Sequence, residues 1–288
     1  MDFAETEDQK MIRGIVREFA EDVAGPTCNK RDKEQIAPIE EFKKFAELGF
    51  AGMTIPEKYG GQKLDDISEA IVVEELSRVD PSLGVMIAVH VGLCSMTIAL
   101  SGNEEQKEKY LPKLASGELL GAYSLSEAGS GTDAAAMVAR ATDDGEHYTL
   151  NGEKMWVTNG TTADLFVLFA KVTDHPDYGK KSHGGVTCFI VEKGFEGFEI
   201  GKKEDKLGIR SSDTCTLMLN KCKVPKANVL GDVGKGFPIA MNALDNSRIG
   251  IAAQALGIAQ GAYEAALKYS KERETFGKPI AAHQSISN

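Results

Sequence analysis

The chain of 288 residues has few of the residues that build metal sites, disulfide frameworks or nucleic-acid-binding surfaces. Its five cysteines and five histidines are scattered, and no two cysteines stand at the CxxC spacing, so neither a zinc site nor a disulfide framework is predicted. Arginine is scarce as well, with 8 residues against 25 lysines, and the excess of acidic residues gives a formal net charge of −10. Such a surface repels phosphate backbones, which argues against a nucleic-acid partner.

The first ten residues, MDFAETEDQK, lack the apolar core of a secretion signal. Together with the cysteine pattern, this absence indicates a reducing cytoplasm. One run, Leu83–Leu100, has no formal charge and reaches the lower length limit for a membrane span. It contains His90, Ser95 and Thr97 and has no basic or aromatic flanks, so we expect a helix buried inside a soluble domain and no membrane span.

Apolar residues recur at three- and four-residue spacing in the first third of the chain, which predicts an all-α domain over residues 1–120. One helix runs through Met11 and Val23 to a stop at Gly25-Pro26, and a second covers residues 39–49. A third covers residues 71–79 and ends at Asp80-Pro81. The uncharged helix and a charged helix over Glu104–Leu114 follow.

Near Gly121 the period changes from 3.6 to 2, and strands do not alternate with helices, which predicts an antiparallel β-sandwich or barrel over residues 121–232. Asn151-Gly152 predicts a hairpin turn, and Asp143-Asp144-Gly145 a second turn. The expected strands are Ala122–Ser126, Met137–Thr142, Tyr148–Leu150, Lys154–Thr158, Leu165–Lys171, Val186–Glu192, Phe198–Ile200 and Cys215–Leu219. Cys215 and Cys222 are expected to be packing residues.

From Phe237 the helical period returns, with a stripe of small residues between Ile249 and Ala262 that allows helices to approach closely. The chain stops where a further helix has barely begun, so residues 233–288 are expected to be the beginning of a truncated C-terminal α-helical bundle. The fold class predicted is therefore α+β with several domains.

Two runs could carry chemistry. Tyr123–Asp133 begins as a strand and ends in a loop of small and hydroxylated residues, which lets backbone N–H groups approach a planar or phosphorylated ligand. An ordinary polar turn is the alternative. Lys154–Gly160 holds the only tryptophan, and on a strand Trp156 and Thr158 point to the same side, as a flat heteroaromatic ligand requires. The alternative is a Trp156 ring that fills the core of the sandwich.

Both runs, in a helix–β–helix order, resemble the acyl-CoA dehydrogenase family of flavoproteins along essentially the whole chain. The further motifs that carry the resemblance are Lys206–Ser212, Val224–Gly231, Gly236-Phe237 and Glu272–Ile280. The MDF start is similar to that of short-chain bacterial members.

The resemblance implies FAD as the cofactor and no metal. The residues that it places around FAD in the same chain are Tyr123, Leu125, Ser126, Gly131, Thr132, Trp156, Val157 and Thr158. The residues that it places on the FAD of a neighbouring subunit are Arg273, Thr275, Phe276, His283 and Gln284. For Arg273, a solvated charge at a helix end is the alternative.

The implied substrate is an acyl-CoA thioester. The residues that the resemblance places on it are Thr132, His183, Asp245, Asn246, Ser247 and Arg248. The acyl chain is expected along the uncharged helix, with Val89, His90, Leu93, Cys94 and Thr97 as candidates.

The implied reaction is α,β-dehydrogenation to the trans-2-enoyl-CoA: a carboxylate removes the α-proton while the β-hydrogen leaves as hydride to the flavin. Family members carry the catalytic Glu at one of two positions. The first is Ser247 here, which cannot act as a base, and the second is expected beyond Asn288. No residue of this chain, Glu127 included, is assigned as the base, so the 288-residue chain is expected to be inactive.

The resemblance further implies an electron-transfer flavoprotein as the electron acceptor and a homotetramer built as a dimer of dimers. A cytoplasmic location is expected, or the mitochondrial matrix if the source is eukaryotic. Two alternatives stay open: an acyl-CoA oxidase-like flavoenzyme, and a non-catalytic module of the same fold that binds acyl-CoA or a protein.

Overall fold

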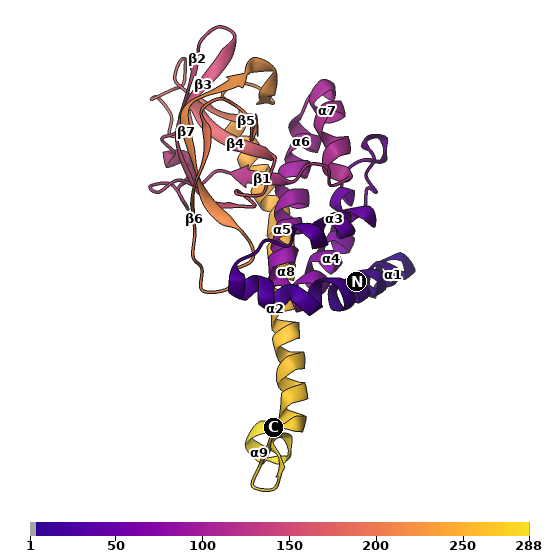
Figure 1. The fold of residues 1–288 in the computed structure, drawn as a ribbon. Coiled ribbons are helices and arrows are strands. Elements are labelled where there is room, and N and C mark those ends of the chain that lie inside the picture. The colour runs from indigo at the N-terminus through magenta and orange to yellow at the C-terminus, as the bar shows by residue number, and fades with distance from the viewer. Residues whose placement is uncertain (1–3, 288) are drawn as a thin grey trace.

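A computed structural model describes residues 4–287, so the MDF start and Asn288 lie outside the described residues. Figure 1 shows a helical domain beside a β domain, with the long helix α8 running along both and continuing past them to the C-terminal end. The predicted fold class is confirmed: helices come first, a sheet follows, and the start of a second helical region ends the chain.

The helical domain contains the helices that the apolar spacing predicts and one further helix, α2. The bounds are α1 Glu7–Phe19, α2 Gly25–Glu34, α3 Ile39–Glu47, α4 Asp66–Val79, α5 Pro81–Ala88, α6 Met96–Ser101 and α7 Glu104–Ala115. The buried residues of α3, Phe42, Phe45 and Ala46, are the apolar positions of its pattern. The expected stop at Asp80-Pro81 also holds, because α4 ends at Val79 and the Asp80 carboxylate caps α5.

The predicted stop at Gly25-Pro26 is wrong, because the helix continues through it. A π-helical turn, Ala20–Ala24, joins α1 to α2, and the Gly25 N–H donates to the carbonyl of Ala20, five residues back. Pro26 then stands in the first turn of α2, directly after the π-helical turn. The wider turn also gives the proline ring room that a regular turn would deny it.

The uncharged run forms one continuous helix, Pro81–Ser101, made of α5, the π-helical turn Val89–Ser95 and α6. By length and composition it could cross a membrane, yet 78% of its most apolar window is buried inside the protein. His90 is fully buried, accepts from the Gly121 N–H at 3.0 Å and lies 3.1 Å from the Leu114 carbonyl. Burial lowers the pKa of His90 to about 4, so the ring is neutral and links this helix to its neighbours.

The β domain is an eight-stranded sheet in the order β6-β7-β3-β2-β4-β5-β8, with β1 paired to β4. The strands are β1 Gly121–Ser124, β2 Arg140–Asp143, β3 His147–Thr158, β4 Leu165–Val172, β5 Val186–Glu192, β6 Phe198–Lys203, β7 Thr214–Pro225 and β8 Val229–Leu230. Both β1 and β2 run parallel to β4, so the sheet is mixed where a wholly antiparallel one was expected. Cys215 and Cys222 are buried in the core, as expected.

The hairpin predicted at Asn151-Gly152 is wrong, because residues 147–158 form the single strand β3. The pairing register of β3 on β7 shifts between Leu150 and Gly152, which marks a β-bulge. Gly152 has φ +145°, and a Cβ there would stand 2.8 Å from Ala139, so only glycine fits. By contrast, the expected turn at residues 143–145 does join β2 to β3, with Gly145 at φ +99°.

Helix α8, Gly236–Glu272, crosses α4 closely along its small-residue stripe. A Cβ on Gly257 would stand 2.2 Å from the Glu74 carbonyl oxygen, and one on Gly261 would stand 2.1 Å from that of Arg78. The expected close packing of helices is therefore found, but Gly257 and Gly261 make it. Of the residues expected in the stripe, only Ala253 is buried, and the exposed ones are Ile249, Ala252, Leu256, Ile258, Ala259 and Ala262. After α8 come the short strands β9 Glu274–Thr275 and β10 Lys278–Pro279 and the helix α9 Gln284–Ser287, at the tip seen in Figure 1.

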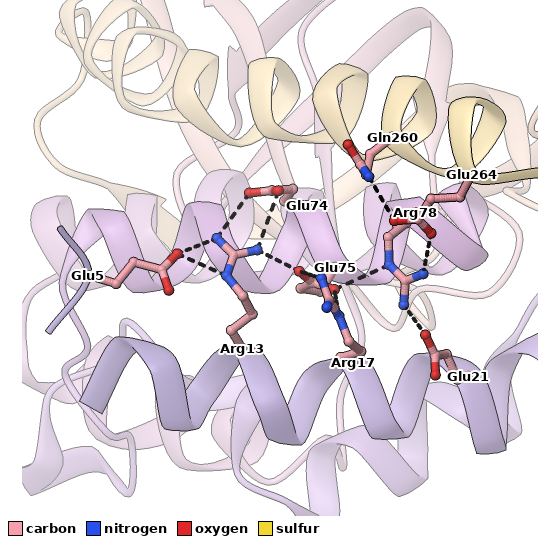
Figure 2. A network of polar contacts seen from close by, with 9 residues as sticks. All are labelled: Glu5, Arg13, Arg17, Glu21, Glu74, Glu75, Arg78, Gln260 and Glu264. Atoms are coloured by element: carbon pink, nitrogen blue, oxygen red, sulfur yellow. Dashed lines mark hydrogen bonds and ion pairs between the residues drawn. The ribbon is translucent and has the colours of Figure 1, made fainter. Parts of the chain in front are cut away.

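An ion-pair network fixes the register of α1, α4 and α8 (Figure 2). Glu75 of α4 is 1% exposed and accepts from Arg17 of α1 at 2.9 Å and from Arg78 at 3.3 Å. Arg78 also pairs with Glu264 of α8 at 2.8 Å. Burial alone would raise the pKa of Glu75, but hydrogen bonds from Arg17 and Arg13 outweigh it and hold the pKa below its ordinary value.

Candidate active site

A cavity of about 540 Å³ opens where the helical domain, the β domain and the start of α8 meet. Four segments line it: the uncharged helix, the loop after β1, the last residues of β3, and one face of α8. Its lining residues are Val89, Leu93, Tyr123, Leu125, Ser126, Gly131, Thr132, Asp133, Ala134, Ala135, Met155, Trp156, Thr158, Phe237, Met241, Leu244 and Arg248.

The loop after β1 is held in place by a buried ion pair. Lys154 of β3 is fully buried, and its Nζ donates to the Glu127 carboxylate at 2.7 Å and to the Leu125 carbonyl at 2.9 Å. The same carboxylate accepts from the backbone N–H groups of Val138 at 2.6 Å and Ala139 at 3.1 Å. Burial lowers the pKa of Lys154, and Glu127 opposes that shift. Glu127 therefore serves as the anchor of the loop.

Trp156 faces the cavity because β3 bulges. The register of β3 on β7 shifts between Lys154 and Val157, and Trp156 takes φ +59°, which is rare for a bulky residue. Its side chain is 58% exposed, so the alternative of a core-filling tryptophan is wrong. Simple strand alternation also fails here, although Trp156 and Thr158 do line the same cavity.

The structure gathers most of the residues expected around the cofactor. Those that line the cavity are Tyr123, Leu125, Ser126, Gly131, Thr132, Trp156 and Thr158. Val157 does not line it, because its side chain is 1% exposed and packs in the core. The bulge at Trp156 separates Val157 from its two neighbours.

The residues expected to reach a neighbouring subunit lie apart from the cavity, beyond the end of α8 (Figure 1). Thr275 Oγ1 stands 3.1 Å from His283 Nε2, and the Phe276 and His283 rings are 6.0 Å apart. Phe276 is 97% exposed. Arg273 follows the last residue of α8, and Gln284 begins α9. Their role at a second subunit stays a prediction.

The residues expected to bind the substrate do not all line the cavity. Arg248 lines the cavity, whereas Ser247 donates to the Leu244 carbonyl at 3.1 Å and does not line it. Asp245 is exposed and pairs with Arg248 at 3.3 Å. Asn246 lines a different, smaller cavity. Thr132 lines the cavity. His183, the last expected residue, stacks on the Phe237 ring at 5.2 Å between centroids.

Of the five acyl-pocket candidates, Val89 and Leu93 line the cavity. His90, Cys94 and Thr97 do not, since they lie on the other faces of the same helix, and Thr97 donates to the Leu93 carbonyl. On the cavity-lining face of α8, Arg248 was expected, but Phe237, Met241 and Leu244 were not. The four residues are spaced by four, three and four positions, and this spacing could have identified the face. Ala134 and Ala135 were not expected either, whereas Asp133 and Met155 belong to the two runs singled out from the sequence but had no role of their own.

The smaller cavity, of about 220 Å³, lies between α4, the uncharged helix and α8 and contains the half-buried Glu69. Burial, and secondly the nearby charge of Asp66, raises the pKa of Glu69 from 4.5 to about 7. Between pH 4.5 and about 7, Glu69 therefore keeps its proton in the folded protein but has lost it in the unfolded chain. Stability from this group is present below pH 4.5 and is lost as the pH rises through about 7.

We therefore expect Glu69→Gln to be more stable than the wild type at pH 8, by about 1–3 kcal/mol, and nearly equal to it at pH 5. Urea unfolding at the two pH values measures the difference. Asp66→Asn, on the exposed side of the same cavity, is the companion variant and should move the transition to lower pH. Identical pH profiles for the wild type and Glu69→Gln would show that Glu69 is well solvated.

The fold and this cavity define the class of protein: the chain belongs to the acyl-CoA dehydrogenase family. Its N-terminal-domain model matches residues 6–118, its middle-domain model residues 122–222, and its C-terminal-domain model residues 234–288. The described residues contain no group of three or more His, Cys, Asp or Glu side chains that could hold a metal ion.

Particular relatives are similar over the whole chain. The short-chain specific acyl-CoA dehydrogenase of Clostridium acetobutylicum is 47% identical over 287 residues, which are 100% of this chain and 74% of the relative. The structure of butyryl-CoA dehydrogenase from Megasphaera elsdenii aligns with a TM-score of 0.94 at 43% identity, over 100% of this chain and 75% of that one. A chain from a structure described as the electron transferring flavoprotein of Acidaminococcus fermentans aligns with a TM-score of 0.95 at 48% identity, over 100% and 74%.

Proposed function

We propose that the full-length protein is an FAD-dependent dehydrogenase that converts short acyl-CoA thioesters into trans-2-enoyl-CoA and passes the electrons to an electron-transfer flavoprotein. The observation that carries this proposal is the set of unpaired hydroxyl groups around one cavity that also presents an exposed indole ring. The names of the relatives favour a short acyl chain and an electron-transfer flavoprotein as partner.

The residues of the cavity fit a flavin. Among the described residues, the hydroxyls of Ser126, Thr132 and Thr158 have no hydrogen-bond partner, and all three line the cavity. Trp156 supplies an aromatic face, and a Cβ on Gly131 would meet no protein atom within 4 Å, so the space beyond that backbone is free. A flat heteroaromatic ring with polar edges matches this combination.

Bound there, FAD would supply the acceptor for the hydride that leaves the β-carbon. The chain's own residues would bind the ring and orient it. The hydroxyls of Ser126, Thr132 and Thr158 would hold its polar edges, and Trp156, which also lines the cavity, would offer an aromatic surface. Val89 and Leu93 offer apolar contact to an acyl chain and exclude water beside the reacting carbons. Arg248 gives a cation for the anionic part of the substrate.

Removal of the α-proton needs a base, and among the described residues no buried carboxylate lines this cavity. Asp133 is the one carboxylate among its lining residues, and it is exposed. Ser247, at the family's first base position, points elsewhere. We propose that the base belongs to the quarter of the relatives' length that this chain does not span. The same lack of a clear base is what favours the second candidate, a non-catalytic module that binds acyl-CoA.

We also propose a cytoplasmic homotetramer. Large apolar side chains stand exposed on α8, which fits a helix that packs against further protein. They are Ile249, Ile251, Leu256, Ile258, Tyr263, Leu267 and Tyr269.

Purified full-length protein should be yellow, and its flavin absorption should bleach when butyryl-CoA is added without oxygen. Thr158→Ala should slow the bleaching or weaken FAD retention by on the order of 1–3 kcal/mol, because a buried polar partner loses its hydrogen bond. Thr158→Ser keeps the hydroxyl and is the matched control. A protein that stays colourless after incubation with FAD contradicts the flavoenzyme. A yellow protein that binds butyryl-CoA without bleaching supports the binding module.

A further inference from the structure

Asn159, the residue directly after β3, connects three of the segments that surround the active-site cavity. Its side chain is fully buried, and its amide donates to the carbonyl of Met86 in the uncharged helix and to the carbonyl of Gly121 in β1, both at 3.1 Å. Its backbone N–H donates to the Asp213 carbonyl at 2.9 Å. Asn159 does not line the cavity itself, but Thr158, directly before it, does.

The two side-chain partners of Asn159 select the type of residue at this position. Both are carbonyl oxygens, which only accept hydrogen bonds, so the side chain between them must offer two donors. A side-chain amide does so, whereas an ionised Asp offers no donor and Ser or Thr offers one. The backbone of Asn159 also has φ +64°, a region that Asn enters more easily than most residues.

Two unfavourable features lie directly beside Thr158. Asn159 Oδ1 is buried and has no hydrogen-bond partner among the described residues. Thr158 also stands between two residues with left-handed backbone, Trp156 at φ +59° and Asn159. Unpaired buried polar atoms are rare in native proteins, and sparsely populated backbone conformations gather at functional sites. Their coincidence next to a cavity-lining hydroxyl indicates that the placement of this hydroxyl matters for function.

The two carbonyls that Asn159 holds belong to segments that carry other cavity-lining residues. The uncharged helix continues from Met86 to Val89, which would contact the acyl chain. Strand β1 continues from Gly121 to Tyr123, which would contact the cofactor. One buried amide therefore fixes the end of β3 relative to both of these segments.

We propose that Asn159 is a positioning residue for the dehydrogenation, because it holds the Thr158 hydroxyl in place for the polar edge of the flavin. The inference rests on the proposed function. Asn159 lies outside the cavity, so its loss is felt through Thr158 and not through a contact of its own. A group misplaced by about 1 Å can cost a reaction about 100-fold in rate, so a buried residue of this kind has a large effect.

The test is a double-mutant cycle in the full-length, FAD-loaded protein. Asn159→Gly removes both donors and tolerates the left-handed backbone. We expect the rate of flavin bleaching by butyryl-CoA without oxygen to fall about 10- to 100-fold. The Kd for FAD, measured by quenching of flavin fluorescence, should rise. In a Thr158→Ala background the same change should alter either quantity by less than about 2-fold, because the hydroxyl that Asn159 positions is already absent.

Lys221→Gly is the matched control. Lys221 also has a positive φ, +54°, but it is exposed on β7 and does not line the cavity. It introduces the same backbone freedom and should leave the bleaching rate and the Kd for FAD unchanged. Asn159→Asp keeps the shape of the side chain and, while ionised, has no donor, so it gives the same comparison if the glycine variant does not fold.

Equal losses in the two backgrounds overturn the inference, since Asn159 would then act independently of Thr158. Wild-type bleaching and FAD affinity in Asn159→Gly overturn it as well. The wild type is scored first. If it does not bleach, the proposed function fails and the inference with it, whereas normal bleaching of the wild type together with equal losses in both backgrounds contradicts the inference alone.

Discussion

The 288-residue chain, loaded with FAD and mixed with butyryl-CoA without oxygen, is expected to keep its flavin oxidised. The same protein extended by the C-terminal quarter that its relatives have should bleach. Loss of a catalytic base alone costs about 10²–10⁴-fold in rate. Ser247 cannot replace the base, since its hydroxyl is directed to the Leu244 carbonyl and not into the cavity.

Stopped-flow absorption of the flavin band measures both proteins under identical conditions. Asp133→Asn in the 288-residue chain is the accompanying variant, because Asp133 is the one carboxylate among the described cavity-lining residues. Comparable rates for the short and the extended protein would contradict the expectation. A rate that then falls in Asp133→Asn would assign the proton transfer to Asp133.

The helices were predictable because their burial follows from spacing along the chain. In α3 the apolar positions alone indicate which face is buried, and the structure buries that face. The π-helical turns were not predictable. Ala20–Ala24 and Val89–Ser95 differ from α-helix in hydrogen-bond partner but not in apolar pattern. Gly25-Pro26 is an ordinary stop signal, so the sequence predicted a helix end there, whereas the π-helical turn lets the chain continue as α2.

The two wrong predictions in β3, a hairpin at Asn151-Gly152 and simple alternation at Trp156, have a different cause. A β-bulge is set by the pairing with the neighbouring strand, which the sequence of one strand does not show. Asn151-Gly152 reads as a turn when taken alone, but β7 pairs with β3 on both sides of it. The same holds at Trp156, whose exposure is set by a shift of register and not by alternation. The strand β8 has two residues and is too short to give a pattern.

For the site, the resemblance identified the loop after β1 and the end of β3, and the structure brings both to one cavity. On the α8 face it identified Arg248 alone, because Phe237, Met241 and Leu244 carry no polar chemistry and only their helical spacing marks them. It also could not predict that Val89 and Leu93 line the cavity while His90 does not. That distinction depends on which side of the helix faces Leu114 and Gly121.

Lys154→Met is expected to destabilise the protein by about 3–5 kcal/mol, the usual cost when one partner of a buried ion pair is removed. The Glu127 carboxylate would keep its two backbone donors, Val138 and Ala139, but it would be left without a counter-charge, and the Leu125 carbonyl would lose its donor. Urea unfolding measures the change in the free energy of unfolding.

The double variant Lys154→Met/Glu127→Gln separates the cost of an unpaired buried charge from the cost of altered packing. Removing both charges leaves no unpaired ion, so it should regain a large part of the loss, as buried pairs replaced by neutral groups often do. Because Lys154 also holds the Leu125 carbonyl, the loop that carries Ser126 and Thr132 should loosen in the single variant. FAD should then dissociate faster, which fluorescence of released flavin measures. Equal stability of the wild type and Lys154→Met would mean that the two backbone donors alone suffice to hold the buried carboxylate, and that the loop does not depend on Lys154.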